Sequence, residues 1–443
     1  MLFLTLSHIM KLNSSGIIKN LIAGLTVSFA AISLGAAFGV MSGRGAMAGM
    51  IGAAVIPIIT SIIGGTRLQA SGPTAPMTAV TALIVAKAYE LIPDATLAAQ
   101  FITLTILMSS VIMFLMALLR TGNLIKFVPN AVVLGFMNGI ALLIWFDQVV
   151  HLFGLNGKPQ LDGGLLVNLL LVLGTLVLIY GIPGITKRTK MKEQVKLFLS
   201  PVLLAILIVT FGTFFSGIEV QSVEMGVSIG SATEFFSFIA SCVPKSEILT
   251  SHFMWMALPL AFQLAMLGYL DSLLTSLVID RMTGEKTRRN KELFAQGISN
   301  AASGLLQGLP GAQATIRSVL LLKEGADSRL AGVFVGIFAL IFILFFGHWI
   351  TLIPSAVFIA ILLKAGWDVT DRDYTRAYFR GKWWTSYKRN FQVLIIALTM
   401  VITVVVDLNT AVISGTILFF GVTFLFKKYG FIDVEHQLEE SID

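Results

Sequence analysis

The chain has 443 residues, of which 56% are hydrophobic and 12% are charged, whereas about 25% of the residues of a soluble domain are charged. This composition excludes a soluble globular protein and indicates an integral membrane protein. The formal net charge of +7 does not point to nucleic acid, because the basic residues lie in short loops between apolar runs, as expected for the cytoplasmic loops of membrane proteins.

The apolar runs are long and continuous rather than alternating, which favours an all-α fold over a membrane barrel. The single cysteine, Cys242, excludes an intramolecular disulfide and a four-cysteine metal site, and the five histidines have no metal-ligand spacing. We therefore expect no cofactor and no resident metal, apart from a coupling ion.

Apolar runs of spanning length, together with two shorter ones, predict fourteen membrane segments. They lie at 18–40, 44–64, 74–90, 96–119, 126–147, 163–182, 196–216, 253–279, 291–308, 314–323, 329–347, 351–366, 390–406 and 409–426. The third and the tenth are the short ones, and we expect them to be half-helices.

The charges of the loops predict the orientation of these segments. An even number of segments places both termini on one side, and basic loops should mark the cytoplasm. The connection at 217–252 carries four glutamates against one lysine and falls on the opposite side. We expect a multi-pass plasma-membrane protein with residues 1–17 and 428–443 in the cytoplasm. The basic residues on that side are Lys187, Arg188, Lys190, Lys192, Lys196, Arg281, Lys286, Arg288, Arg289, Lys291, Arg372, Arg376, Arg380, Lys382, Lys388 and Arg389.

The two halves of the sequence share short patterns in the same order. The Gly/Pro-rich stretch 62–76 resembles 305–312, and 127–133 resembles 352–358. These matches predict two repeats of seven segments, 18–216 and 253–427, in opposite orientations because seven is odd. Inverted repeats with broken helices are typical of secondary transporters whose site lies at the repeat interface. Chance similarity of short Gly/Pro-rich pieces is the alternative.

Asp271 stands at the centre of an apolar segment, where a charge costs about 2.5–3.5 kcal/mol on insertion scales. It should therefore face a polar interior or a partner, and Thr275 lies one turn further on the same helical face. Arg317, in the short tenth segment, is a candidate partner. Asp271 could instead be structural and only hold Arg317 in place, and the Thr275 hydroxyl could simply bond to its own helix.

Pro73 and Pro310 are suited to starting the two short segments at mid-membrane depth, because proline at a helix start loses no hydrogen bond. Two helix starts that face one another form an anion site from their unpaired amides and partial positive charge. Simple helix kinks are the alternative for the prolines. Side chains that could add donors to such a site are Thr74, Thr315, Ser318 and Arg317.

Three motifs occur in order along the chain: Ser71–Met77, Leu270–Ser276, and Asn290–Asn300 followed by Ser303–Gly304. Together they resemble the SulP family of anion transporters, over about Gly16 to Lys428. The resemblance implies a seven-plus-seven inverted repeat. It also implies a core domain of segments 1–4 and 8–11, a gate domain of segments 5–7 and 12–14, and an elevator-like movement of one against the other.

The site of the sodium/bicarbonate symporters in this family implies anion and sodium roles for five positions here, with Gln313 in place of their glycine. Arg317 is instead similar to the arginine of the sulfate and prestin-like members. Residues 31–34 lack the proline of most members, and the 15 residues after Lys428 predict that the family's STAS domain is absent. The five positions are Thr74, Asp271, Thr275, Ala314 and Thr315.

We expect a symporter of a small inorganic anion, with sulfate favoured over bicarbonate and protons over sodium. Sodium bound at Asp271 would lie close to the Arg317 guanidinium, and the two positive charges would repel each other. A homodimer through the membrane domain stays open. The alternatives are a sodium-coupled bicarbonate symporter, a nucleobase transporter, an anion channel and a membrane enzyme. The last three lack, respectively, a second carboxylate, a ring-forming charged motif and a catalytic constellation.

Overall fold

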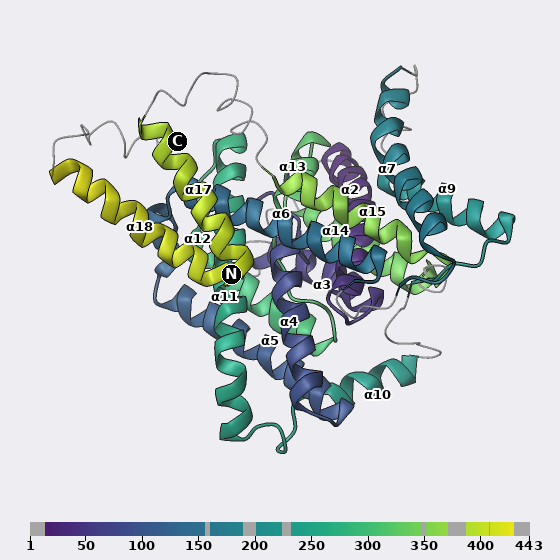
Figure 1. Cartoon of the computed structure of the whole chain (residues 1–443), viewed down its shortest axis with the longest axis horizontal. Helices are drawn as coiled ribbons and strands as arrows, with labels where there is room; N and C mark the ends of the chain where they lie inside the picture. The colour runs from purple at the N-terminus through teal and green to yellow at the C-terminus, as the bar shows by residue number, and fades with distance from the viewer. Residues whose placement is uncertain are drawn as a thin grey trace. The chain divides into compact units, whose positions relative to one another are not determined.

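The computed structural model describes residues 14–155, 160–188, 201–223, 232–346, 351–370, 387–406 and 408–428. Each of the fourteen predicted segments overlaps one α-helix of these residues (Figure 1). The helices are α2 (Ser14–Met41), α3 (Ala46–Ile63), α4 (Ala75–Leu91), α5 (Ala95–Leu118), α6 (Asn130–Phe153), α7 (Leu165–Arg188), α9 (Pro201–Ser216), α11 (Ser251–Thr283), α12 (Arg289–Leu305), α13 (Thr315–Lys323), α14 (Leu330–Phe346), α15 (Ser355–Val369), α17 (Tyr387–Val405) and α18 (Leu408–Lys428).

Two further helical elements were not predicted from the sequence. A 3-10 helix, η1 (Thr121–Phe127), precedes α6, and α10 (Ala232–Cys242) lies within the 217–252 connection. Length and composition mark six of the described helices, α2, α3, α5, α6, α7 and α11, as able to cross a membrane. Shorter apolar helices lie within α9, α14, α17 and α18. The arrangement as seven plus seven spans stays a prediction.

The chain divides into two compact units. The first comprises 1–122 and 150–362, and the second comprises 123–149 and 363–443. This division differs from the core and gate implied by the resemblance, because α7, α9 and the part of α15 up to Leu362 fall in the first unit. Every candidate site residue also belongs to the first unit.

The expectation of an all-α chain was wrong at one place. Two short strands, β1 (Ser71–Gly72) and β2 (Ala312–Gln313), pair antiparallel, with Ser71 opposite Gln313 and Gly72 opposite Ala312. Each strand directly precedes a short helix, β1 before α4 and β2 before α13. The pairing gives buried backbone groups hydrogen-bond partners where the helices are broken.

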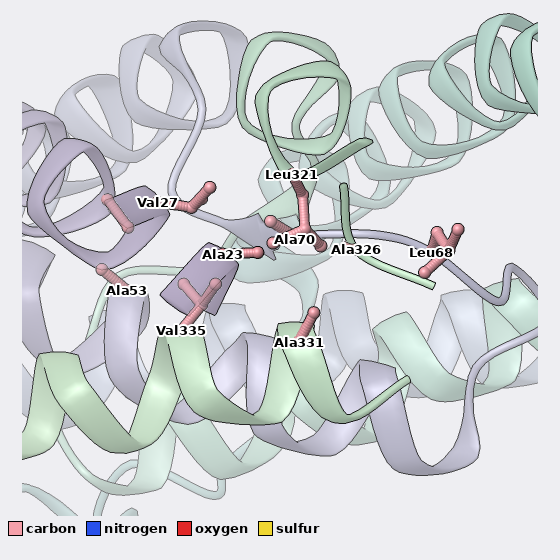
Figure 2. Close-up of a cluster of buried hydrophobic side chains, with 10 residues drawn as sticks. Ala23, Val27, Ala53, Leu68, Ala70, Leu321, Ala326, Ala331 and Val335 are labelled. Atoms are coloured by element: carbon pink, nitrogen blue, oxygen red, sulfur yellow. The ribbon is translucent and has the colours of Figure 1, made fainter. Parts of the chain in front are cut away.

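A cluster of small and branched apolar residues holds α13 against its neighbours (Figure 2). Leu321 of α13 is fully buried among residues of α2, α3 and α14, and Ala70, next to β1, belongs to the same cluster. The small side chains allow these helices to approach closely, as is usual for helix contacts inside membranes. The members are Ala23, Val27, Ala31, Ala53, Leu68, Ala70, Leu321, Ala326, Ala331 and Val335.

Candidate anion site at the paired strands

Glycines allow the two broken segments to meet. A Cβ on Gly311 would clash with the backbone of Gly72, and a Cβ on Gly52 of α3 would lie 2.6 Å from the carbonyl oxygen of Leu309 and 2.8 Å from Pro73. Gly72 has φ +146°, which L side chains rarely adopt. The close crossing of the segments therefore requires glycine at these positions.

The short helices begin within one residue of the predicted segments, which start at 74 and 314. α4 begins at Ala75, with Thr74 as its N-cap and Pro76 in its first turn, so Pro73 lies just before the helix. α13 begins at Thr315, with Ala314 as its N-cap. The prediction that Pro310 starts this helix was wrong, because the residues between Pro310 and Thr315 include strand β2. Both caps lack a side-chain hydrogen bond, so the first amides of each helix have no capping side chain.

Arg317 lies in the first turn of α13 and is 2% exposed. Its Nη2 donates a hydrogen bond to the carbonyl oxygen of Pro73 at 2.8 Å, which links α13 to the start of α4. Its Nη1 is buried and has no partner among the described residues. A Cβ on Gly72 would lie 2.9 Å from this Nη1, so the free end of the guanidinium lies directly against the strand pair.

Asp271 and Thr275 lie on α11, and both are buried. The Asp271 carboxylate is close enough to Arg317 for an electrostatic interaction, but its Oδ2 has no hydrogen-bond partner in the described part of the chain. The salt bridges found there do not include an Asp271–Arg317 pair. Arg317, the candidate partner of Asp271, is therefore not in a direct ion pair with it, because a backbone carbonyl holds the guanidinium instead.

The hydroxyls of Thr275 and Thr315 lie 2.6 Å apart and share a hydrogen bond between α11 and the start of α13. The Thr275 hydroxyl therefore reaches a neighbouring helix. The oxygens of Asp271, Thr275 and Thr315 are the ones that a sodium ion would use if it bound here. The described residues contain no group of three or more His, Cys, Asp or Glu side chains that could hold a metal ion.

The remaining predicted residues surround the same crossing. Ser318 accepts a hydrogen bond from the Ala70 amide at 3.1 Å, so its oxygen fastens the segment before β1. Gln313 accepts one from Thr66 at 3.3 Å, while its Nε2 is buried without a partner among the residues described. The Thr74 hydroxyl is likewise buried, and it lies close enough to the Asp271 carboxylate to interact with it. Ala314 contributes only its backbone, as the N-cap of α13.

One face of α12 holds both segments, a role that the sequence did not reveal. Asn300 donates to the Gly311 carbonyl at 2.9 Å and accepts from the Gly311 amide at 2.8 Å. Glu292 Oε2 accepts hydrogen bonds from the Gly65 and Thr66 amides at 2.8 and 2.9 Å. Gln296, between them on the helix, donates to Ser71 at 2.9 Å. These residues belong to the third motif noted in the sequence, and their contacts now show what the motif does.

The site therefore combines a buried guanidinium, two helix starts and donors without partners among the described residues. Burying such groups is costly unless they bind an acceptor. Arg317 Nη1 and Gln313 Nε2 can both donate. A small anion is the ligand that would satisfy them, because its oxygens accept hydrogen bonds and its charge matches the helix starts.

Comparison with known proteins decides the family. The sequence profile of the sulfate permease family matches residues 17–397. The chain belongs to this family. Within it, the chain is 31% identical to "Putative sulfate transporter YvdB" of Bacillus subtilis, over 91% of this chain and 72% of that protein. It is equally 31% identical to the bicarbonate transporter BicA of Picosynechococcus, over 91% and 70%.

Two solved structures share the fold of this chain. The transmembrane domain of a cyanobacterial BicA matches with a TM-score of 0.74 and 28% identity, over 91% of this chain and 99% of that one. SLC26A9 matches with a TM-score of 0.73 and 15% identity, over 95% and 67%, which supports the fold alone. The protein is thus a membrane anion transporter of the sulfate permease family.

Proposed function

We propose that this protein takes up sulfate or a similar oxyanion together with a proton, as a secondary active transporter. The observation that carries the proposal is the buried Nη1 of Arg317, which has no partner in the described residues and lies against Gly72 at the strand pair. A fixed positive charge with a free donor at this depth fits a bound anion better than it fits a purely structural role.

A tetrahedral oxyanion suits the site because it can accept hydrogen bonds in several directions. The planar guanidinium of Arg317 favours oxygens held side by side. Gln313 Nε2 offers a further donor. Relatives named as sulfate transporters, including one from Arabidopsis chloroplasts that is 24% identical, agree with this choice of substrate.

Asp271 would supply the coupling to protons. Its charge acts on Arg317 without a direct ion pair, so an ionised Asp271 weakens the field that attracts an anion. Protonation of Asp271 removes that opposing charge and strengthens anion binding. Proton and anion then bind together and leave together, which is the requirement for symport.

Movement of the first unit would carry the bound ions across the membrane. The strand pair, α4, α11 and α13 all belong to this unit, so the proposed site can move without being taken apart. An elevator-like step of this kind is one form of rigid-body alternating access.

A sodium-coupled bicarbonate symporter is the second candidate. The hydrogen bond of 2.6 Å between the Thr275 and Thr315 hydroxyls is the observation in its favour, because it brings two oxygens together near Asp271. Similarity to two bicarbonate transporters, at 31% and 30% identity, points the same way. We favour protons because sodium at these oxygens would be repelled by Arg317.

The test of the anion site is sulfate binding to the purified protein, measured by calorimetry. Arg317→Gln should weaken sulfate binding by about tenfold or more, because it removes a charge-assisted hydrogen bond. Arg317→Lys should restore binding only in part. The matched control is Arg329→Gln, since Arg329 is a half-buried arginine of the same unit that bonds to the Ser61 carbonyl. A folded Arg317→Gln protein with unchanged sulfate affinity would refute the proposal.

A further inference from the structure

A cavity lies in the first unit, beside the turn between α2 and α3. Its volume is 370 Å³, and it is lined by the turn between α2 and α3, the beginning of α5, and α10. Cavities of a few hundred Å³ are large enough for a small organic molecule. The residues that matter for the argument are Arg44, Gln307 and Cys242, with Met47, Ile102 and Phe238 as apolar walls.

Arg44 is the charged group of this cavity. It lies between α2 and α3 and is half-buried, and an arginine guanidinium keeps its charge in proteins. Cys242 and Tyr89 are the other titratable residues among those that line the cavity. No Asp or Glu is among the described residues that line the cavity. A cationic side chain in a partly apolar cavity without a carboxylate favours an anionic ligand.

Two hydrogen bonds hold the Arg44 guanidinium in place. Arg44 Nη2 donates to Gln307 Oε1 at 2.5 Å, and Nη1 donates to the Gly308 carbonyl at 3.4 Å. A guanidinium has five N–H groups, so donors remain after these two bonds. Gln307 also donates to the Thr103 hydroxyl at 3.2 Å, and this bond holds its side chain in place.

Helix α10 forms one wall of the cavity because hydrogen bonds from Gln100 of α5 hold its C-terminal end. Gln100 donates to the Ser241 carbonyl at 3.0 Å and accepts from the Lys245 amide at 3.2 Å. These bonds bring Cys242 and Phe238 to the cavity. Cys242 is the only cysteine of the chain, so its chemical modification reports on this cavity alone.

We propose that this cavity binds a small organic monoanion, with its carboxylate on Arg44 and its apolar body against Met47, Ile102 and Phe238. The ligand class follows from the walls, because sulfate would leave the apolar surface uncovered. The site is separate from the one proposed for the transported anion, since none of its lining residues is among the candidate residues at the strand pair.

The experiment measures alkylation of Cys242 by N-ethylmaleimide in the purified full chain, with benzoate as the probe. Burial raises the pKa of the Cys242 thiol, so the reaction is slow and ligand protection can be followed in time. Benzoate should slow the reaction, while benzyl alcohol, a neutral molecule of similar shape, and sulfate at the same concentration should not. Equal protection by benzyl alcohol or sulfate, or none by benzoate, would overturn the proposal.

Two variants separate this cavity from the strand-pair site. Arg44→Gln should raise the benzoate concentration needed for protection by about tenfold or more, whereas Arg317→Gln should leave it unchanged. Loss of protection in Arg317→Gln, or full protection in Arg44→Gln, would contradict the assignment. Should Arg44→Gln not fold, Ala99→Phe fills the cavity from α5 and keeps Arg44. It should abolish benzoate binding measured by calorimetry, and unchanged binding would refute the site.

Discussion

Replacing Asn300 with Ala should release Gly311, the residue before β2, from α12. The side-chain amide makes two hydrogen bonds to the backbone of Gly311, at 2.8 and 2.9 Å, and both residues are buried. The substitution leaves a buried N–H and a buried C=O without partners, each at a cost of about 1–3 kcal/mol, so the loss is about 2–6 kcal/mol. Local movement of the backbone should bring the measured value toward the lower end.

The assay is thermal unfolding of the purified protein in detergent, followed by intrinsic fluorescence. Ser299→Ala is the matched control, because Ser299 is equally buried and its hydroxyl only bonds to the Gln296 carbonyl of its own helix. Asn300→Asp adds a further check. A protonated aspartic acid has one donor and one acceptor, like asparagine, so the stability of this variant should recover on acidification.

Two results would refute this reasoning. The first is an unfolding midpoint for Asn300→Ala that equals that of Ser299→Ala, which would show that the paired bonds to Gly311 do not hold the segment. The second is an Asn300→Asp variant whose stability relative to wild type does not change between pH 8 and pH 5.

Three further predictions follow from the same contacts. Gly72→Ala should abolish sulfate binding, because the added Cβ would lie 2.9 Å from Arg317 Nη1. Gly174→Ala is the control, since Gly174 has open space around it. Equal sulfate affinities of the two variants would contradict this prediction. Glu292→Gln should destabilise the protein by about 2 kcal/mol or more, because Glu292 accepts two buried backbone hydrogen bonds. Glu285→Gln breaks only a half-exposed ion pair with Arg67 and should cost about 1 kcal/mol or less. The reverse order of stabilities in thermal unfolding would contradict the role given to Glu292. In a Cys242→Ser background, an impermeant thiol reagent should label Ser246→Cys from outside and Lys286→Cys only after permeabilisation. The two exposed positions lie before and after α11, which should place them on opposite sides of the membrane. Labelling of both positions from one side would disprove the proposed topology.

Most of the helices could be predicted because they coincide with long apolar runs of the sequence. The short segments predicted at 74–90 and 314–323 lie close to α4 and α13, since Gly and Pro mark the breaks before them. Strands of two residues have no periodicity to detect, so β1 and β2 were missed, and Pro310 was wrongly taken as a helix start. Helix α10 was missed because it is short and does not coincide with a long apolar run.

The residues of the candidate site could also be predicted only in part. Asp271 and Arg317 stood out because charges are rare in apolar segments. The absence of a direct salt bridge between them could not be foreseen, because it depends on the Pro73 carbonyl, which is 244 residues from Arg317. The role of Asn300 was hidden for a similar reason, since its polar partner, Gly311, lies beyond the end of α12. Sequence spacing shows what lies on one helix face, but not which loop returns to meet it.

The central claim is that anion uptake is coupled to protons through Asp271. It is tested most directly by radiolabelled sulfate uptake into proteoliposomes in sodium-free buffer, driven only by an inward proton gradient. The account predicts accumulation by the wild type and none against a gradient by Asp271→Asn, because that variant cannot exchange a proton. Uptake by the wild type only when sodium is present, or accumulation against a gradient by Asp271→Asn, would contradict it.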